Sequence, residues 1–329
     1  MSLTFSLKKI IRPLGSAVLG LSLLSAASSV QAQSKPLIRV LVGFPAGAGT
    51  DQLARIYANF LSNKLDANVV VENRPGAGGL LAAQALAASK DNNQTLLFGV
   101  DHQFVMLPLI TKNPGFDVKK DMIPIARIAN FYTCLAVPAS SSAQTLQDYI
   151  DSTKKDINQG NYGVPAIGSQ AHFVGYVLAG HYKTTMTPVP YRGAAPAITD
   201  LIGAQIPSAI VPCDALVEHR KSGKIRVLAM VSEKRYSQMP DVPTFIENGV
   251  KMPTDAFQAV YASINFNPEL LKKITQATEE IFNDPETTQK VAATYMEPDY
   301  ASPQQLAEIV EINTKFWGQQ VKKSNFQLQ

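Results

Sequence analysis

The 329-residue sequence lacks the short motifs on which nucleotide sites, metal sites and nucleophilic centres are usually built. Its first glycine turn, Gly47-Ala48-Gly49, is followed by no third glycine of the dinucleotide fingerprint, and neither a phosphate loop nor a Gly-x-Ser-x-Gly elbow occurs. The four histidines have no zinc-binding spacing. We therefore expect no cofactor, no metal and no catalytic residue.

Long apolar runs and an excess of one charge are also missing. The apolar run 14–27 follows Lys8, Lys9 and Arg12 and precedes small residues ending at Ala32; it is shorter than the ~20 residues of a membrane span. These features predict a signal peptide at 1–32, cleaved near Ala32, and a periplasmic product. The leader carries three of the formal +4 charges, which leaves +1. We expect no nucleic-acid partner.

Cysteine is scarce, since only Cys134 and Cys213 are present. They lie in separate apolar segments of a chain expected in an oxidising compartment, so a disulfide is one interpretation. The other, which we favour on sequence alone, is two buried thiols that act as small apolar side chains.

The first hundred residues after the leader alternate between strands and helices. Apolar runs predict strands at 37–44, 69–72 and 95–99, and helical periodicity predicts helices at 51–65 and 79–89. Either Thr50 or Asp51 is suited to cap the first helix. The strands are apolar on both faces, which is typical of a parallel sheet covered by helices.

A second alternating stretch follows Pro124. We expect strands at 131–137, 161–164, 187–191, 208–211 and 225–231, and helices at 145–157, 171–183, 195–202 and 215–221. The tail is predicted to be helical at 268–283, 285–295 and 303–323, where Ser302, Pro303 and Gln305 form a capping signal. The fold class is therefore α/β, with two doubly wound units and a C-terminal helical layer on the first.

Two strand-to-helix turns are the best candidates for a binding site. A glycine turn that opens a helix exposes backbone N–H groups at the positive end of the helix dipole, which suits a carboxylate or phosphate. The turn at 43–50 has this form in the first unit, and the turn at 164–170 has it in the second. His102 and His172 are pocket candidates as much as structural residues.

Over almost the whole mature chain the sequence resembles the periplasmic solute-binding receptors of tripartite tricarboxylate transporters, the Bug or TctC-like family. The segments that carry the resemblance are IRVLVGFP (38–45) with the glycine turn and Thr50-Asp51, VVENRPGAGG (70–79), NY (161–162) with Gly168-Ser169 and His172, VPYRG (189–193) with PAITDLIG (196–203), and PDVPT (240–244).

This resemblance implies a two-domain, type II Venus-flytrap fold, with domain 1 formed by 33–130 plus 236–329 and domain 2 by 131–235. It implies that the loops of both domains hold the carboxylate of a small ligand through backbone amides and water. Combined with the turns, it gives the expected ligand-binding residues: Phe44, Ala46, Gly47, Ala48, Thr50, Asp101, His102, Ile167, Gly168, Ser169, His172, Arg192, Gly193 and Asp214.

Departures from the family pattern bear on ligand choice. Ala46 and Ala48 replace a commoner proline and glycine, and Asp101-His102 stands where small hydroxyl residues or glycine are frequent. We expect Asp101 to face the pocket, where it either binds a ligand amine or disfavours a second carboxylate.

The function predicted from the sequence is capture of a small organic acid and its delivery to transporter membrane subunits by a monomeric receptor. The acid is a di- or tricarboxylate, an amino acid or an aromatic carboxylate. Two alternatives stay open: a receptor that feeds a sensor, and a periplasmic enzyme with Asp101, His102, His172 and Asp214 in its cleft.

Overall fold

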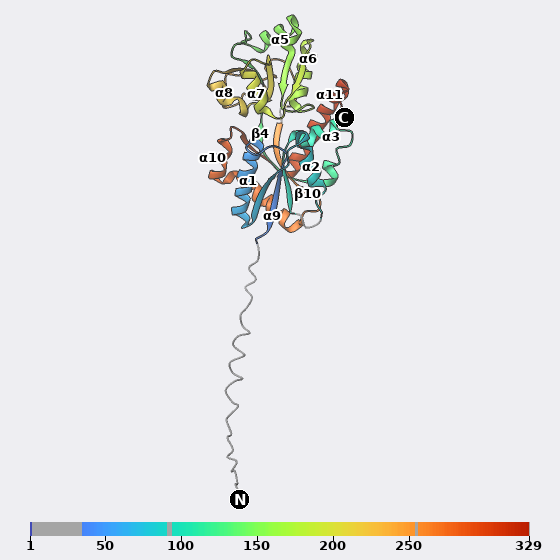
Figure 1. Ribbon diagram of the computed structural model, residues 1–329, viewed down its shortest axis with the longest axis vertical. Coiled ribbons are helices and arrows are strands. Elements are labelled where there is room, and N and C mark those ends of the chain that lie inside the picture. The colour runs from blue at the N-terminus through green and yellow to red at the C-terminus, as the bar shows by residue number, and fades with distance from the viewer. Residues whose placement is uncertain (2–34, 91–93, 254–255, 329) are drawn as a thin grey trace. The chain divides into compact units, whose positions relative to one another are not determined.

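The computed structural model describes residues 1, 35–90, 94–253 and 256–328, and its helices and strands all lie in one unit, Pro36–Gln329 (Figure 1). The expected signal peptide at 1–32 lies outside the described residues, apart from Met1. The domain boundaries at 130/131 and 235/236 stay a prediction.

The first sheet has six strands in the order β11-β4-β10-β3-β1-β2. Its strands are β1 (Leu37–Val42), β2 (Asn68–Asn73), β3 (Thr95–Val100), β4 (Met122–Phe131), β10 (Ala256–Ser263) and β11 (Glu297–Ala301). The strands β1, β2 and β3 are parallel, as their alternation with helices predicts. The other three make antiparallel pairs, β10 with β3 and β4, and β11 with β4.

The second sheet has five strands in the order β7-β6-β8-β5-β9. They are β5 (Thr133–Pro138), β6 (Asn161–Val164), β7 (Thr187–Pro190), β8 (Ser208–Pro212) and β9 (Ile225–Val231). The strands β6, β7 and β8 are parallel, whereas β5 runs antiparallel to both of its neighbours. Mixed sheets of this kind follow when strands arrive from the other sheet rather than from a crossover helix.

The predicted strand at 131–137 is wrong as a single element. Phe131 ends β4 in the first sheet and Thr133 begins β5 in the second, so the apolar run belongs to two sheets. Most of β4, and all of β10 and β11, were not predicted. An apolar run has the same appearance in either sheet, and only long-range pairing decides where it breaks.

The helices match the sequence pattern more closely. They are α1 (Gly49–Leu65), α2 (Leu80–Ala87), α3 (Leu107–Ile110), α4 (Val118–Asp121), α5 (Leu146–Lys155), α6 (Gln170–Tyr182), α7 (Ala194–Ile202), α8 (Val217–Lys221), α9 (Pro268–Glu279), α10 (Pro285–Ala292) and α11 (Pro303–Ser324). Single turns are η1 (Ala77–Gly79), η3 (Ile157–Gly160), η4 (Asp214–Leu216) and η5 (Ile281–Asn283), and η2 (His102–Met106) is a π-helical turn.

The C-terminal helices cover the first sheet. In Figure 1 the orange α9 and α10 lie near the blue α1, and both contact it. Helix α11 packs on β4 and also contacts α6, and its Ser302–Gln305 capping box is formed as predicted. Apolar side chains of β1, β3 and α1 pack with those of α9 in one core, while Trp317 of α11 belongs to a second core that reaches both sheets.

Cys134 and Cys213 form a disulfide, so the preference for two free thiols is wrong. Strands β5 and β8 pair side by side, with Cys134 opposite Val211, and Cys213 follows the end of β8. This register sets the two Cα atoms 5.1 Å apart, within the range that a disulfide spans. Both cysteines are fully buried.

Candidate functional site

The first glycine turn leads from β1 into α1 and leaves the helix without a side-chain cap. Gly47 adopts a positive φ of 83°, which glycine accepts without strain. The N-cap is Ala48, whose methyl group accepts no hydrogen bond. The first N–H groups of a helix have no acceptor within it, so this end of α1 presents donors to an external anion.

Asp51 fixes the turn rather than capping the helix, which corrects the expectation for Thr50 or Asp51. Its buried carboxylate accepts from the N–H of Gly47 at 2.8 Å and from Arg55 Nε and Nη2 at 3.0 and 2.9 Å. The helix begins one residue before Thr50, at Gly49, which places Asp51 in its first turn facing back along the chain.

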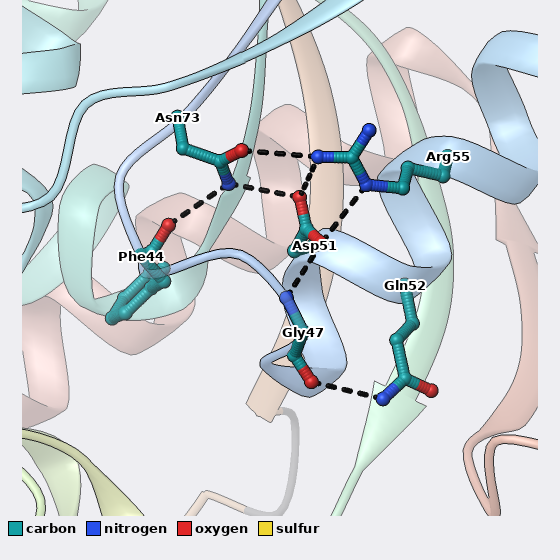
Figure 2. A network of polar contacts seen from close by, with 6 residues as sticks. All are labelled: Phe44, Gly47, Asp51, Gln52, Arg55 and Asn73. Atoms are coloured by element: carbon teal, nitrogen blue, oxygen red, sulfur yellow. Dashed lines mark hydrogen bonds and ion pairs between the residues drawn. The ribbon is translucent and has the colours of Figure 1, made fainter.

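Asn73, at the end of β2, completes this network (Figure 2). Its Nδ2 donates to the carbonyl of Phe44 at 3.0 Å and to Asp51 Oδ1 at 2.8 Å, and its Oδ1 accepts from Arg55 at 3.1 Å. Burial alone would raise the pKa of Asp51, but the bonds from Arg55, Gly47 and Asn73 outweigh it and lower that pKa. Asp51 is therefore a fixed anion that holds the loop.

The turn of the second sheet lies between β6 and α6. Ser169 caps α6 and accepts from the N–H of His172 at 3.3 Å, as its position predicts. Gly168 has a φ of +73°, and its N–H donates to Nδ1 of His172 at 3.0 Å. Burial lowers the pKa of His172 to about 4, so the ring is neutral and accepts this bond.

The Gly168 turn packs against Ile110, the last residue of α3, and against Phe326 of the C-terminal segment. A Cβ atom placed on Gly168 would lie 2.4 Å from Cδ1 of Ile110 and 3.0 Å from Cε1 of Phe326. The ring of His172 also meets Phe326 edge-on, with centroids 4.9 Å apart. His172 thus fixes the turn and its contact with the C-terminal segment.

Gln170 was not predicted as a site residue, although its side-chain amide is buried at this turn without a hydrogen-bond partner among the described residues. It is the first residue of α6, it is 4% exposed, and neither Nε2 nor Oε1 has a partner among the described residues. Buried amides are normally hydrogen-bonded, so these two atoms have capacity for a ligand or for water. A polar residue after the predicted cap was the only signal in the sequence.

Asp101 and His102 follow β3 and are both buried. Burial raises the pKa of Asp101 to about 7, although the N–H groups of His102 and of Asp101 itself lower it. Burial lowers the pKa of His102 to about 4. His102 Nε2 would lie 2.6 Å from a Cβ on Gly78, so the second glycine turn needs glycine to pass this ring.

Asp214 approaches the uncapped end of α1 from the second sheet. It begins η4, just after β8 and Cys213. Its Oδ2 would lie 3.5 Å from a Cβ on Gly49, the first residue of α1, and Oδ1 is shielded from solvent with no partner in the described part of the chain. Burial raises the pKa of Asp214 to about 7, against the N–H groups of Asp214 and Ala215, which lower it.

Met296 also lies against Gly49 and is bonded in turn to Gln258, and neither residue was predicted. The Cε atom of Met296 would lie 2.7 Å from a Cβ on Gly49, and its Sδ accepts from Gln258 Nε2 at 3.0 Å. Gln258, on β10, is 2% exposed. These contacts join residues far apart in sequence, which no local pattern could reveal.

The remaining predicted residues are less closely involved. Phe44 and Ile167 are half-buried, Ala46 and Arg192 are exposed, and Gly193 donates its N–H to the carbonyl of Pro165 at 2.9 Å. The structure therefore brings Asp214 to the start of α1 and leaves the Arg192 side chain at the surface. Which of the predicted residues touch a ligand stays a prediction.

Two hollows lie away from these turns. One, of about 420 Å³, is lined by α6 and α11, and the other, of about 530 Å³, includes Arg220, Arg226 and Asp241. None of the predicted site residues lines either hollow. Across the described residues, no group of three or more His, Cys, Asp or Glu side chains is placed to hold a metal ion, and no helix is long and apolar enough for a membrane span.

Comparison with known proteins identifies relatives of the chain. Residues 53–326 match the model of the tripartite tricarboxylate transporter family receptors. The chain is 33% identical to a UPF0065 protein of Bordetella bronchiseptica over 259 residues, which are 78% of this chain and 77% of that protein.

Solved structures agree with this match. An R. palustris protein solved with adipate has 27% identity and a TM-score of 0.82, over 89% of this chain and 98% of that one. The periplasmic binding protein BugD has 24% identity and a TM-score of 0.79, over 89% and 99% of the two chains. The predicted fold, that of a periplasmic binding protein with two sheets, is confirmed.

Proposed function

Because the chain belongs to the tripartite tricarboxylate transporter receptor family, we propose that it is an exported solute receptor that captures a small organic carboxylate. The solute binds between the turns of the two sheets and is then delivered to the membrane subunits of a transporter of that class. The receptor acts as a monomer in the periplasm after removal of residues 1–32.

The observation that carries this proposal is the uncapped start of α1, which faces Asp214 of the second sheet. Ala48 supplies no side-chain acceptor, so the N–H groups that follow it are free to bind a carboxylate. Asp51, Asn73 and Arg55 hold the turn in place before any ligand arrives. Such preorganisation reduces the ordering cost of binding.

The second sheet supplies the other half of the proposed site. Ser169 and His172 fix the start of α6, and the amide of Gln170 offers a buried donor and acceptor there. A ligand that touches both turns would favour their approach, which is how a solute receptor signals occupancy to its transporter. The adipate bound by the R. palustris relative is a carboxylate of suitable chemistry.

A thermal-shift screen followed by calorimetry tests the proposed ligand class. The panel contains adipate, malate, citrate, glutamate and benzoate, and each compound that raises the melting temperature is recovered and analysed. We expect at least one carboxylate to bind and to be recovered unchanged, since a bound ligand stabilises the native state in proportion to RT ln(1 + [L]/Kd). A ligand consumed in solution would indicate an enzyme instead.

A pair of substitutions at Gly49 tests the proposed donor. Gly49→Ala and Gly49→Pro both add a Cβ beside Met296, but only proline removes the N–H. Proline is tolerated at the first helical position, and the extended φ and ψ of Ala48, −65° and 157°, suit a following proline. We expect Gly49→Pro to bind its carboxylate about tenfold or more weakly than Gly49→Ala. Equal affinities would show that this N–H does not contact the ligand.

A further inference from the structure

Two buried side-chain oxygens form no hydrogen bond within the described residues, one beside the start of α1 and one linked to it through Met296. One is Asp214 Oδ1, and the other is Gln258 Oε1, whose amide nitrogen is already bonded to Met296. Asp214 and Met296 both lie close to Gly49, the first residue of α1, and Gln258 is linked to this point by its bond to Met296. Unsatisfied buried acceptors of this kind are rare and costly in native proteins.

A carboxylate ligand alone would leave these acceptors unsatisfied. Its oxygens need donors, and its negative charge would oppose ionisation of Asp214, whose side chain faces the end of α1 where that ligand is proposed to bind. Arg55 of α1 is not available to these oxygens because it is bonded to Asp51 and Asn73. A cationic donor on the ligand would bond to both oxygens and favour the ionised form of Asp214.

We propose that the solute carries a protonated nitrogen as well as a carboxylate, and that Asp214 binds this nitrogen with Gln258 Oε1 as a second acceptor. The inference rests on the proposed function and narrows its substrate class to amino carboxylates. In this arrangement the N–H groups at the start of α1 hold the carboxylate, and Asp214 selects against acids that lack the amine.

The positions of Asp214 and Gln258 account for this division of roles. Asp214 is anchored beside the buried Cys134–Cys213 disulfide, so its backbone position is fixed by β5 and β8. Gln258 is fixed by β10, which pairs with both β3 and β4. Acceptors held by two different sheets discriminate between ligands by position, because neither oxygen has another donor among the described residues.

Matched ligand pairs that differ by one amine test the inference by calorimetry. The pairs are aspartate with succinate, glutamate with glutarate, and 2-aminoadipate with adipate. We expect at least one amine-bearing member to bind the wild-type chain about tenfold or more tightly than its partner. We expect Asp214→Asn to abolish most of that preference, and Gln258→Leu to reduce it.

Glu308→Gln is the matched control, since it removes one exposed carboxylate from α11 and gives the same change in net charge. It should keep the wild-type preference. Circular dichroism and melting temperatures establish that each variant is folded. If Asp214→Asn is unfolded, Asp214→Glu replaces it, since a displaced carboxylate should also shift the preference.

The outcomes separate this inference from the proposed function. Amine-free acids that bind the wild-type chain as well as their amino partners overturn the amine site and leave the receptor proposal standing. A preference for amines that survives Asp214→Asn also overturns the role of Asp214. If no acid in either series binds, and none in the thermal-shift panel does, the carboxylate receptor itself is wrong, and this inference fails with it.

Discussion

Asn73 and Asp51 join the two glycine-rich turns of the first sheet through a 2.8 Å hydrogen bond from the Asn73 amide to the Asp51 carboxylate. The same amide nitrogen donates to the carbonyl of Phe44. Asn73, the last residue before the second turn, therefore holds the first turn in place. This agrees with the buried packing of Gly79 and Gly43 around Gln103.

Asn73→Ala is expected to destabilise the fold by about 1–3 kcal/mol, because it removes three hydrogen bonds and leaves the buried Asp51 with fewer donors. Urea denaturation measures the effect. Asn68→Ala is the matched control, an exposed asparagine at the first position of the same strand, and should change stability by less than about 0.5 kcal/mol. Equal losses from both variants would contradict the supporting role of Asn73.

Gly168→Ala is expected to destabilise the protein by about 1–3 kcal/mol, because alanine is strained at a φ of +73° and its methyl group would collide with Ile110. Gly180→Ala provides the contrast within the same region. Gly180 lies inside α6, where a Cβ meets no atom within 4 Å, so alanine should stabilise the helix by about 0.4–1 kcal/mol. Thermal unfolding of both variants checks the opposite signs, and a stabilised Gly168→Ala would contradict the packing of this turn.

Local signals predicted the helices well and the strands less completely. Helix α11 has its capping box, proline and apolar spacing within a few residues, so its start and end can be read from the chain itself. Strand β10 has no such signal, because its place between β3 and β4 depends on pairing with segments more than a hundred residues earlier. The same dependence explains why one apolar run was predicted as one strand although β4 and β5 divide it.

The candidate site likewise combines features that local sequence predicts with features that depend on long-range packing. Both turns, at Gly47 and Gly168, were predicted from their glycines, and both glycines have a positive φ, but the cap was predicted correctly only at Ser169. The approach of Asp214 and Met296 to Gly49 was not predictable from spacing, since it requires both sheets to be in place. The free amide of Gln170 could be recognised only once the surrounding atoms were known to offer it no partner among the described residues.

The disulfide should make a large contribution to stability. It closes a loop of 79 residues, and a loop of that length predicts a loss of about 4 kcal/mol when Cys134 and Cys213 are both changed to alanine. Urea denaturation of the double variant in oxidising and in reducing buffer measures the loss, and the variant should be indifferent to the reductant. Two reactive thiols in the denatured, unreduced wild-type chain would contradict the pairing.

Asp101→Asn is expected to stabilise the protein increasingly as the pH rises from about 4 to about 7. Burial raises the pKa of Asp101 to about 7, so between its ordinary value of 3.8 and that value the folded chain keeps a proton that the unfolded chain has released. Stability therefore falls as pH rises through this window and levels off above it, where both states are ionised. Asparagine cannot ionise, so the variant escapes this loss.

The neighbouring His102 gives a slope of the opposite sign, because burial lowers its pKa to about 4 and the unfolded chain takes up a proton below 6.5. The wild type and Asp101→Asn both contain His102, so its contribution cancels when the melting temperatures of these two proteins are compared at each pH. Glu308→Gln controls for the loss of one carboxylate. A difference between Asp101→Asn and the wild type that stays constant from about pH 4 to about pH 7 would show that Asp101 is ionised in the folded protein throughout, and that a donor stabilises its charge.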